Sequence, residues 1–294
     1  HVLMLAMVGS YALAIRVSPV AGIVALAVVS AVWPALWHSS LRFRLANTAW
    51  RGLRFRFTGS RLGAYRVLAL PTLAVVVALA GAELIPAPPA DEPRAAPDAS
   101  PGLLMALLSL LPLLLAALLA PLLAWAMRRY QHDHYAWGTQ ACAFTGRLRS
   151  FYGAFAVAGL AAAGTVLSVG LLAGLIALGL HAMGYGASGA AVTTVVLVFV
   201  GYIGVAGVAG GTLVARLQNL SWNGTRAPDV AFRSALRARD QVRLMLKNGL
   251  LIVVTLGLYY PFAAVASARL RSSARAASPP AAAGRWRTPC GCRC

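Results

Sequence analysis

Long apolar runs alternate with short Arg-rich segments along this chain. Four uncharged runs reach the roughly 17 to 25 residues that a membrane-spanning helix needs. They are Val20–Trp37, Gly102–Met127, Ala154–Leu180 and Ala190–Val214. Two shorter runs, residues 2–15 and 67–82, have the same character. The pattern predicts an all-α polytopic membrane protein with about six transmembrane helices, in a single integral membrane domain over residues 1–270.

A last apolar stretch, residues 249–268, lies between Lys247 and Arg269. Gly257 and Pro261 interrupt it near its middle, because neither residue favours a continuous helix. Two structures are open. A re-entrant or interfacial pair of half-helices would keep both basic flanks on one side, whereas a plain seventh span would separate them.

The Arg-rich segments recur. Segment 42–65 matches segment 128–152 at an offset of 87 residues and segment 216–240 at an offset of 172, where about three further residues bring Phe232 opposite Phe57. Recurrence of this kind indicates one unit built several times. The residues that make up the repeated interfacial motif are Asn47, Trp50, Arg54, Arg56, Phe57, Gly59, Trp137, Phe144, Gly146, Asn219, Trp222, Arg226 and Phe232.

Charge sets the expected orientation. Of the 26 Lys and Arg residues, 24 lie in residues 42–66, 128–149, 216–247 and 269–293. Short loops rich in Lys and Arg stay on the cytoplasmic side, so we expect every motif to face the cytoplasm. Residues 83–101 hold four of the seven acids and form a flexible loop on the outside, and residues 271–294 form a disordered tail.

The stretch Leu53–Phe57 alternates apolar and basic residues with the period of a β-strand. We expect short amphipathic strands or hairpins on the cytoplasmic face, with the aromatic side chains in the membrane interface. Arg54 and Arg56 would then meet anionic lipid headgroups. The alternative is that these segments are ordinary loops that pack under the helix ends.

Composition supports a membrane class and indicates no chemistry. Hydrophobic residues make up 60% of the chain and charged residues 11%, against roughly 25% charged in soluble domains. The net charge of +19 lies in short loops, which favours topology over nucleic-acid binding as its explanation. His132, Asp133 and His134 lack a third spaced ligand for a metal. We expect no enzyme, no cofactor and no metal site.

Glycines 201, 204, 207, 210 and 211 recur at helical spacing. Small residues let helices approach closely in lipid, and the alternative is a lined pore or gate. Two function classes therefore stay open. One is a structural or interaction protein whose basic face engages anionic lipid or a protein partner, and the other is a channel or uncoupled transporter with the repeats around a path.

The motifs allow a resemblance to be stated. Leu36 through Tyr65, Ala215 through Asp240, and Asn248 through Pro261-Phe262 with Arg269 resemble the YjgN-type family of bacterial inner-membrane proteins, a family of unknown function. Its members usually begin with a further TLGLY-like unit, and they usually have Trp where this chain has Phe262. The resemblance implies a multi-pass protein of the bacterial inner membrane and supplies no reaction.

Overall fold

The computed structural model describes residues 9–10, 12–14, 16–50, 53–69, 71, 73, 103–137, 140–183, 187–228 and 230–278. The chain forms two compact units, residues 1–142 and 143–294. The expected outside loop, residues 83–101, lies beyond the described residues. So do most of the two short apolar runs, 2–15 and 67–82, and the tail after Ser278.

The first unit joins long helices to a small antiparallel sheet. Its sheet order is β1-β2-β3-β4, and Phe55 lies opposite Trp137 where β2 pairs with β3. Residues 61–69 are also helical. The elements are α2 (Pro19–Ala46), β1 (Ala49–Trp50), β2 (Leu53–Phe57), α4 (Leu103–Asp133), β3 (Tyr135–Trp137) and β4 (Gln140–Ala141).

Helix α2 has clear sequence signals at both ends. Ser18 is extended, and its hydroxyl accepts the Ala21 N–H at 3.1 Å, so it caps the first turn. Pro19 follows at the first helical position, where its missing N–H costs nothing. At the other end, the side chain of Asn47 donates to the Phe43 carbonyl at 2.8 Å.

The core of the first unit lies where the strands meet the helix ends. Phe57, Ala64 and Tyr130 are buried there, and Trp37 and Leu41 pack against them. Because Phe57 is only 9% exposed, the strand turns this aromatic ring toward the protein interior. The expectation that the Phe57 ring lies in the membrane interface is therefore wrong. Its ring packs edge-on against Tyr130 of α4, with the ring centroids 5.5 Å apart, and Tyr130 is far away in sequence.

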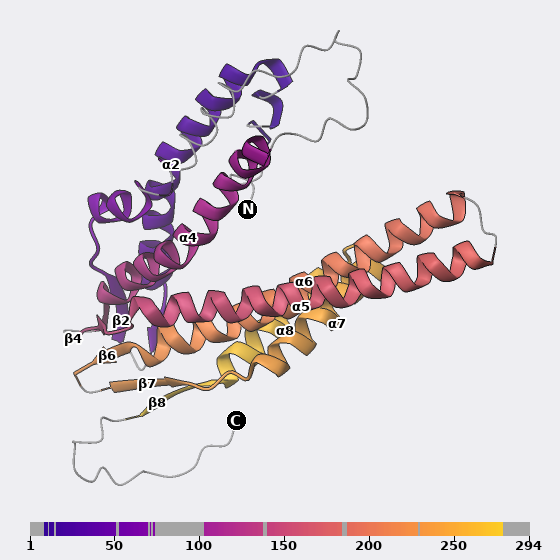
Figure 1. Ribbon diagram of the computed structural model, residues 1–294. Coiled ribbons are helices and arrows are strands. Elements are labelled where there is room, and N and C mark those ends of the chain that lie inside the picture. The colour runs from indigo at the N-terminus through magenta and orange to yellow at the C-terminus, as the bar shows by residue number, and fades with distance from the viewer. Residues whose placement is uncertain are drawn as a thin grey trace. The chain divides into compact units, whose positions relative to one another are not determined.

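The second unit repeats this arrangement around a longer helical hairpin. Its sheet order is β5-β6-β7-β8, all antiparallel. Figure 1 shows the strands β6, β7 and β8 gathered at one end of α5 and α6. The elements are β5 (Ala143–Phe144), α5 (Leu148–Ala182), α6 (Ala187–Asn223), β6 (Thr225–Ala227), β7 (Val230–Ser234), α7 (Ala238–Val254), α8 (Tyr260–Ser273) and β8 (Arg275–Ser278).

Helices α7 and α8 form a tight hairpin. The chain leaves β7, runs along α7, turns within five residues and returns along α8 to β8, which pairs with β7. Gly257 adopts a φ of +94° in the turn, and Pro261 lies in the first turn of α8, as their positions in the sequence predicted. Residues 249–268 therefore fold as parts of two helices joined by a turn, and a single straight helix over this stretch is excluded.

The fold is mostly helical, as expected. Among the described residues, three helices are long and apolar enough to cross a membrane: Val20–Ala46, Leu148–Ala182 and Val196–Asn223. Short strands follow the helices where the motifs predicted them. The prediction of a disordered tail is wrong for residues 271–278, which complete α8 and form β8. Strand β8 is ordered by pairing with β7, which lies more than 40 residues earlier in the sequence.

Candidate membrane-surface site at the strand layers

One backbone contact recurs at each place where a strand leads into a helix. The residue after the strand donates its N–H to the carbonyl at the end of a later helix. Thr58 donates to His134 at 3.0 Å, Thr145 to Gly224 at 2.7 Å and Ala235 to Ala274 at 3.0 Å. This contact satisfies a carbonyl that the helix end would leave unpaired, and it ties each strand layer to the helix ends.

The ends of the helices and strands correct one of the offsets between the repeated segments. The ends of α2 and α6, Ala46 and Asn223, are 177 residues apart, and so are the ends of β2 and β7, Phe57 and Ser234. At the offset of 172, Asn47 and Trp50, which follow a helix, fall on Asn219 and Trp222 inside α6. The offset of 172 is therefore wrong as a match of elements.

The corrected offset also changes the match within the strands. Phe232, placed opposite Phe57 from the sequence, corresponds to Phe55, and Ser234 corresponds to Phe57. Five extra residues in the third segment shift the register, and identical residue types alone could not reveal it. The offset of 87 between the first two segments agrees with the elements, since Phe57 and Phe144 both end strands.

Phe144 and Gly146 have the same relationship as Phe57 and Gly59. A Cβ on Gly59 would approach the Phe57 ring to 2.7 Å, and a Cβ on Gly146 would overlap the Phe144 ring. Phe144 is 9% exposed and lies 6.3 Å from the ring of Phe151. These glycines are required because each buried ring folds directly over the backbone.

Asn219 links helix α6 to the segment between β7 and α7. Its side-chain oxygen accepts the Leu236 N–H and the Ser234 hydroxyl, each at 2.9 Å, and its amide donates to the Leu236 carbonyl at 2.9 Å. Asn223 similarly binds both backbone groups of Ser234, at 2.7 and 3.1 Å. Two Asn side chains on one helix thus hold this connection by its backbone.

Trp222, at the end of α6, contacts two side chains of the sheet in the second unit. The guanidinium of Arg275 lies 4.9 Å over the Trp222 ring, and Phe232 lies 5.5 Å from the same ring. Arg226 is exposed on β6. The side chains of Trp50 and Trp137 are outside the described residues, although their backbones pair with Leu53 and Phe55.

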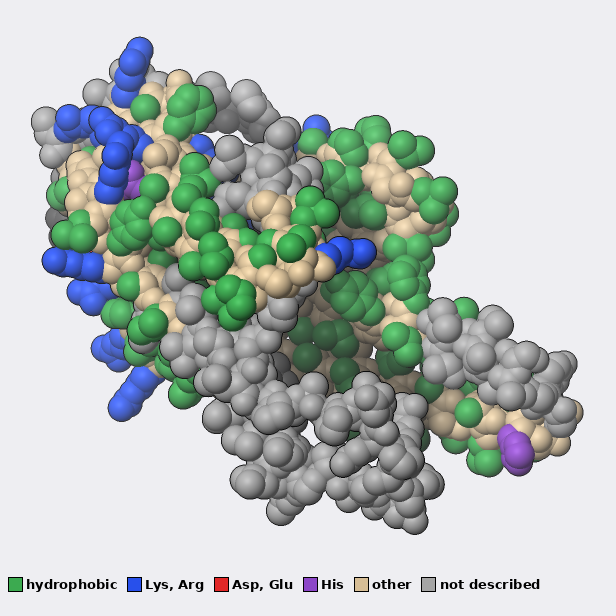
Figure 2. Space-filling model, turned by 90° about the horizontal axis from the view of Figure 1, so that it is seen from above, with side chains coloured by type: hydrophobic (Ala, Val, Ile, Leu, Met, Phe, Trp, Pro, Cys, Tyr) green, Lys and Arg blue, Asp and Glu red, His purple; other side chains and the backbone are tan. Residues whose placement is uncertain are grey.

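Exposed basic side chains surround both strand layers. In Figure 2 several Lys and Arg side chains project from the surface, and no Asp or Glu side chain is seen among the coloured ones of this view. Outside residues 83–101 the chain has only three acids, so the basic side chains far outnumber the carboxylates available to pair with them. The exposed basic residues include Arg54, Arg56, Arg147, Arg149, Arg226, Arg233, Arg237, Arg239, Arg243 and Lys247.

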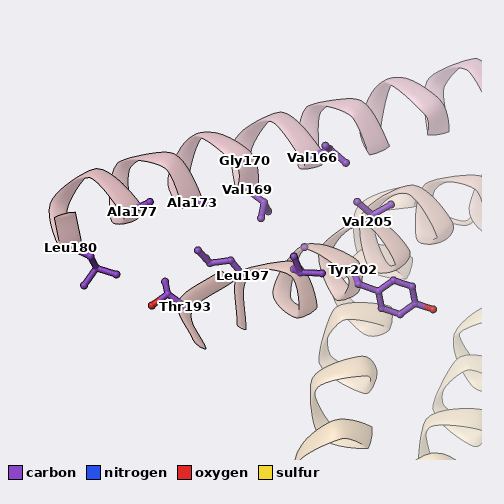
Figure 3. A pocket seen from close by; sticks show the side chains of 12 residues that line it. Val166, Val169, Gly170, Ala173, Ala177, Leu180, Thr193, Leu197, Tyr202 and Val205 are labelled. Carbon is purple, nitrogen blue, oxygen red and sulfur yellow. The ribbon is translucent and has the colours of Figure 1, made fainter. Parts of the chain in front are cut away.

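The glycines of α6 serve close packing. A Cβ on Gly201 or Gly204 would meet Val169 or Thr165 of α5 at 3.2 and 3.1 Å, and a Cβ on Gly211 would meet the α7 backbone at Val242 at 2.9 Å. A groove of about 490 Å³ also lies between α5 and α6. Figure 3 shows Val169 and Leu197 projecting into this groove, whose lining carries no charged group.

The candidate chemical groups are packed into the structure. His132 is 2% exposed, the Nδ1 atom of His134 lies 2.8 Å from the Tyr130 carbonyl oxygen, and Asp133 pairs with Arg129 at 3.5 Å. Across the described ranges, no group of three His, Cys, Asp or Glu residues could hold a metal ion. Burial raises the pKa of the Tyr135 hydroxyl, partly opposed by Arg128, and burial also raises the pKa of the Cys142 thiol.

Several residues of this site have no clear signal in the sequence. His38 is 5% exposed and lies 2.9 Å from the Gly59 carbonyl oxygen, and Tyr130 donates its hydroxyl to Ser60 at 2.6 Å. Gln218 donates to the Arg271 carbonyl at 3.0 Å. Their sequence positions offered one signal: each is a polar residue near the end of an apolar run. Such a residue, if buried, needs a hydrogen-bond partner, but the sequence does not show which one.

Neither a curated protein nor a solved structure matches this chain. A family model does match, over residues 1–288, which is nearly the whole chain. Its description is "bacterial protein of unknown function (DUF898)", and it is the family that the resemblance in the sequence indicated. The chain therefore belongs to the DUF898 family of bacterial proteins of unknown function.

Proposed function

We propose that this chain is a multi-pass protein of the bacterial inner membrane whose strand layers lie at the cytoplasmic surface and bind anionic lipid headgroups through their exposed Arg side chains. Its role is structural, as a protein that organises lipid or a protein partner at that surface. The proposal assigns it no catalytic step. About six transmembrane helices would display the repeated motifs on one side.

The distribution of charge in the second unit carries the proposal. Residues 150–215, which form nearly all of α5 and most of α6, contain no Asp, Glu, Lys or Arg. The two helices meet the sheet at Arg147 and Arg149 on one strand connection and at Arg226 on the other. An uncharged helical hairpin with every cation at one end fits one hydrocarbon layer with one anionic surface.

The burial of Phe57 and Phe144 excludes these two rings from the proposed contact with lipid. Because both rings face the protein interior, the contact with lipid falls to the Arg side chains of the strands. Arg54 and Arg56 extend from the opposite face of β2. The proposed contact is therefore electrostatic at the headgroups, with each near-surface charge contributing about 1 kcal/mol.

The experiment uses full-length protein reconstituted in phosphatidylcholine with a minor fraction of spin-labelled phosphatidylglycerol. We expect preferential association of the anionic lipid, weakened by salt. Changing Arg226 and Arg233 to Gln should lower the relative association constant, by up to about fivefold per charge at low salt. Arg16→Gln is the matched control, since Arg16 is exposed and lies outside the four Arg-rich segments expected at the cytoplasmic side. Equal association of both lipids in the unaltered protein would contradict the proposal.

A channel or uncoupled transporter is the other candidate. The groove between α5 and α6 is the feature that favours it, and solute flux through reconstituted protein would support it. The groove is apolar, and the small residues beside it bring helices into contact. These observations favour the lipid-binding role.

A further inference from the structure

The hairpin of α7 and α8 ends in an exposed apolar tip. Leu256 is 94% exposed, Leu258 81% and Val254 70%. Phe262 and Tyr260, on the first turn of α8, are 67% and 63% exposed. Exposed apolar residues scattered singly need no explanation, but these five are adjacent on one turn of the chain, so they mark an interaction surface.

The backbone of this turn satisfies its own donors. The N–H groups of residues 255 to 260 all bond within the hairpin: Thr255 to Leu251, Leu256 to Val253, Gly257 to Ile252, Leu258 to Thr255, Tyr259 to the Thr255 hydroxyl and Tyr260 to Gly257. The Thr255 hydroxyl in turn donates to the Leu251 carbonyl at 2.7 Å. In water, solvent can accept hydrogen bonds from the N–H groups of a turn, whereas in an apolar environment these groups need partners within the protein.

The interior of the hairpin is also suited to an apolar environment. Asn248, which is 6% exposed, donates to the Ala263 carbonyl at 3.3 Å and to the Ser267 hydroxyl at 3.4 Å, and so joins the two helices. One residue of the turn has a strained backbone conformation. Leu256 adopts a φ of +51°, in the left-handed region that Leu rarely occupies, and keeps its side chain outward.

A basic collar surrounds the base of the apolar tip. Lys247 and Arg243 are exposed on α7, and Arg269 is exposed on α8. Leu256 lies nine positions after Lys247, and α7 covers seven of them, to Val254, which is about 10 Å of helix at 1.5 Å per residue. Half of the hydrocarbon core is about 15 Å thick, so a tip at this distance from headgroup-bound cations stays within one leaflet.

We propose that α7 and α8 form a re-entrant hairpin whose tip, residues 254–262, inserts among the acyl chains of the leaflet that lies against the strand layer, with the collar at its anionic headgroups. The occupant of the apolar surface is lipid, because the cations at the base complement a phospholipid surface. This inference rests on the proposed function and deepens it, since it adds an acyl-chain contact to the headgroup contact.

The test measures the depth of the tip in the full-length protein, with the four native cysteines replaced by alanine. A fluorophore is attached at Leu256→Cys or, in a second variant, at Leu258→Cys, in vesicles of phosphatidylcholine and phosphatidylglycerol. Nitroxides on the headgroup or on the acyl chain report depth, and iodide reports exposure to water. Arg239→Cys is the aqueous control and Leu171→Cys on α5 is the hydrocarbon control, both at exposed positions.

We expect acyl-chain nitroxides to quench the tip fluorophores severalfold more than the fluorophore at position 239, and iodide to quench them severalfold less. Tip fluorophores quenched by iodide, with position 171 quenched by acyl-chain nitroxide, would overturn the insertion and leave the membrane assignment standing. If position 171 also reports water, the proposed function fails with it. Protection of the tip from both quenchers would mean that protein covers it, and would overturn the lipid contact.

Sidedness gives a second measurement. Cysteines at Arg239 and Ser272, one on each side of the hairpin and both exposed, should react with a membrane-impermeant maleimide from the same side of oriented vesicles. Reaction from opposite sides would mean that residues 249–268 cross the membrane, and would overturn the proposal.

Discussion

The side chain of Asn219 pairs with both backbone groups of Leu236, accepting its N–H and donating to its carbonyl, each at 2.9 Å. Seventeen residues separate the two in sequence. Between them run the end of α6 and the hairpin of β6 and β7, so this contact, together with the bonds of Asn223 to Ser234, holds the sheet of the second unit at the end of the helix that leads into it. Leu236 is 5% exposed, so its backbone groups have little access to water.

Asn219→Ala should therefore destabilise the protein strongly. It leaves two buried backbone groups of Leu236 without their partner, at a cost of about 2 to 4 kcal/mol in the free energy of unfolding. Denaturation in mixed detergent micelles, followed by circular dichroism, measures the change. Asn47→Ala is the control, because that exposed side chain makes one bond to Phe43, and it should cost less than about 0.5 kcal/mol. Equal effects of the two changes would refute this account of Asn219.

Gly211→Ala should loosen the packing of α6 against α7. Its Cβ would lie 2.9 Å from the Val242 Cα and 3.0 Å from the Val242 nitrogen, and backbone cannot move aside as a flexible side chain can. We expect a loss of about 1 to 3 kcal/mol in the same denaturation measurement.

Gly174→Ala provides the matched comparison for Gly211. A Cβ at Gly174 meets nothing within 4 Å, so the substitution should stabilise α5 by a fraction of a kcal/mol, through helix propensity. Should Gly211→Ala also stabilise the protein, the close approach of the two helices is wrong.

The turn of the hairpin predicts opposite effects at two neighbouring positions. Gly257→Ala places a Cβ in the left-handed region, where L-residues cost about 1 to 2 kcal/mol, and should destabilise the protein. Leu256→Gly removes such a residue and should raise the thermal midpoint in detergent, where the tip meets no bilayer. Thermal unfolding measures both. A lower midpoint for Leu256→Gly would show that the Leu256 side chain stabilises the hairpin in detergent.

The Cys142 thiol should ionise only at elevated pH. Burial disfavours the thiolate and raises its pKa above the ordinary value, so the native state retains a proton that the unfolded chain gives up first. The stability that this provides is complete below the unfolded pKa and declines as the pH rises toward the folded pKa.

The reaction rate of Cys142 with a thiol reagent measures this shift in a protein whose other cysteines are replaced by alanine. The midpoint of the rate against pH should lie higher for the native protein than for the same protein in denaturant. A native midpoint at or below the denatured one would contradict the burial of the thiol.

Local patterns in the sequence predicted the elements. Uncharged runs of sufficient length indicated α2, α4, α5 and α6, the alternation of Leu53–Phe57 indicated β2, and Gly257 with Pro261 indicated the break between α7 and α8. Each of these depends on properties of the chain over a few residues to one helix, such as periodicity, charge and backbone freedom. The family followed from the same stretches.

Only the tertiary structure decided which residues are partners. The sequence could not show that Phe57 turns inward onto Tyr130, that Ser234 and not Phe232 corresponds to Phe57, or that residues 249–268 fold back so that β8 pairs with β7. These outcomes depend on contacts between residues tens of positions apart, such as Thr58 with His134 and Ala235 with Ala274. The periodicity of a segment shows which of its faces is apolar. It does not show whether that face is buried against lipid or against protein, because the protein partner comes from a distant part of the chain.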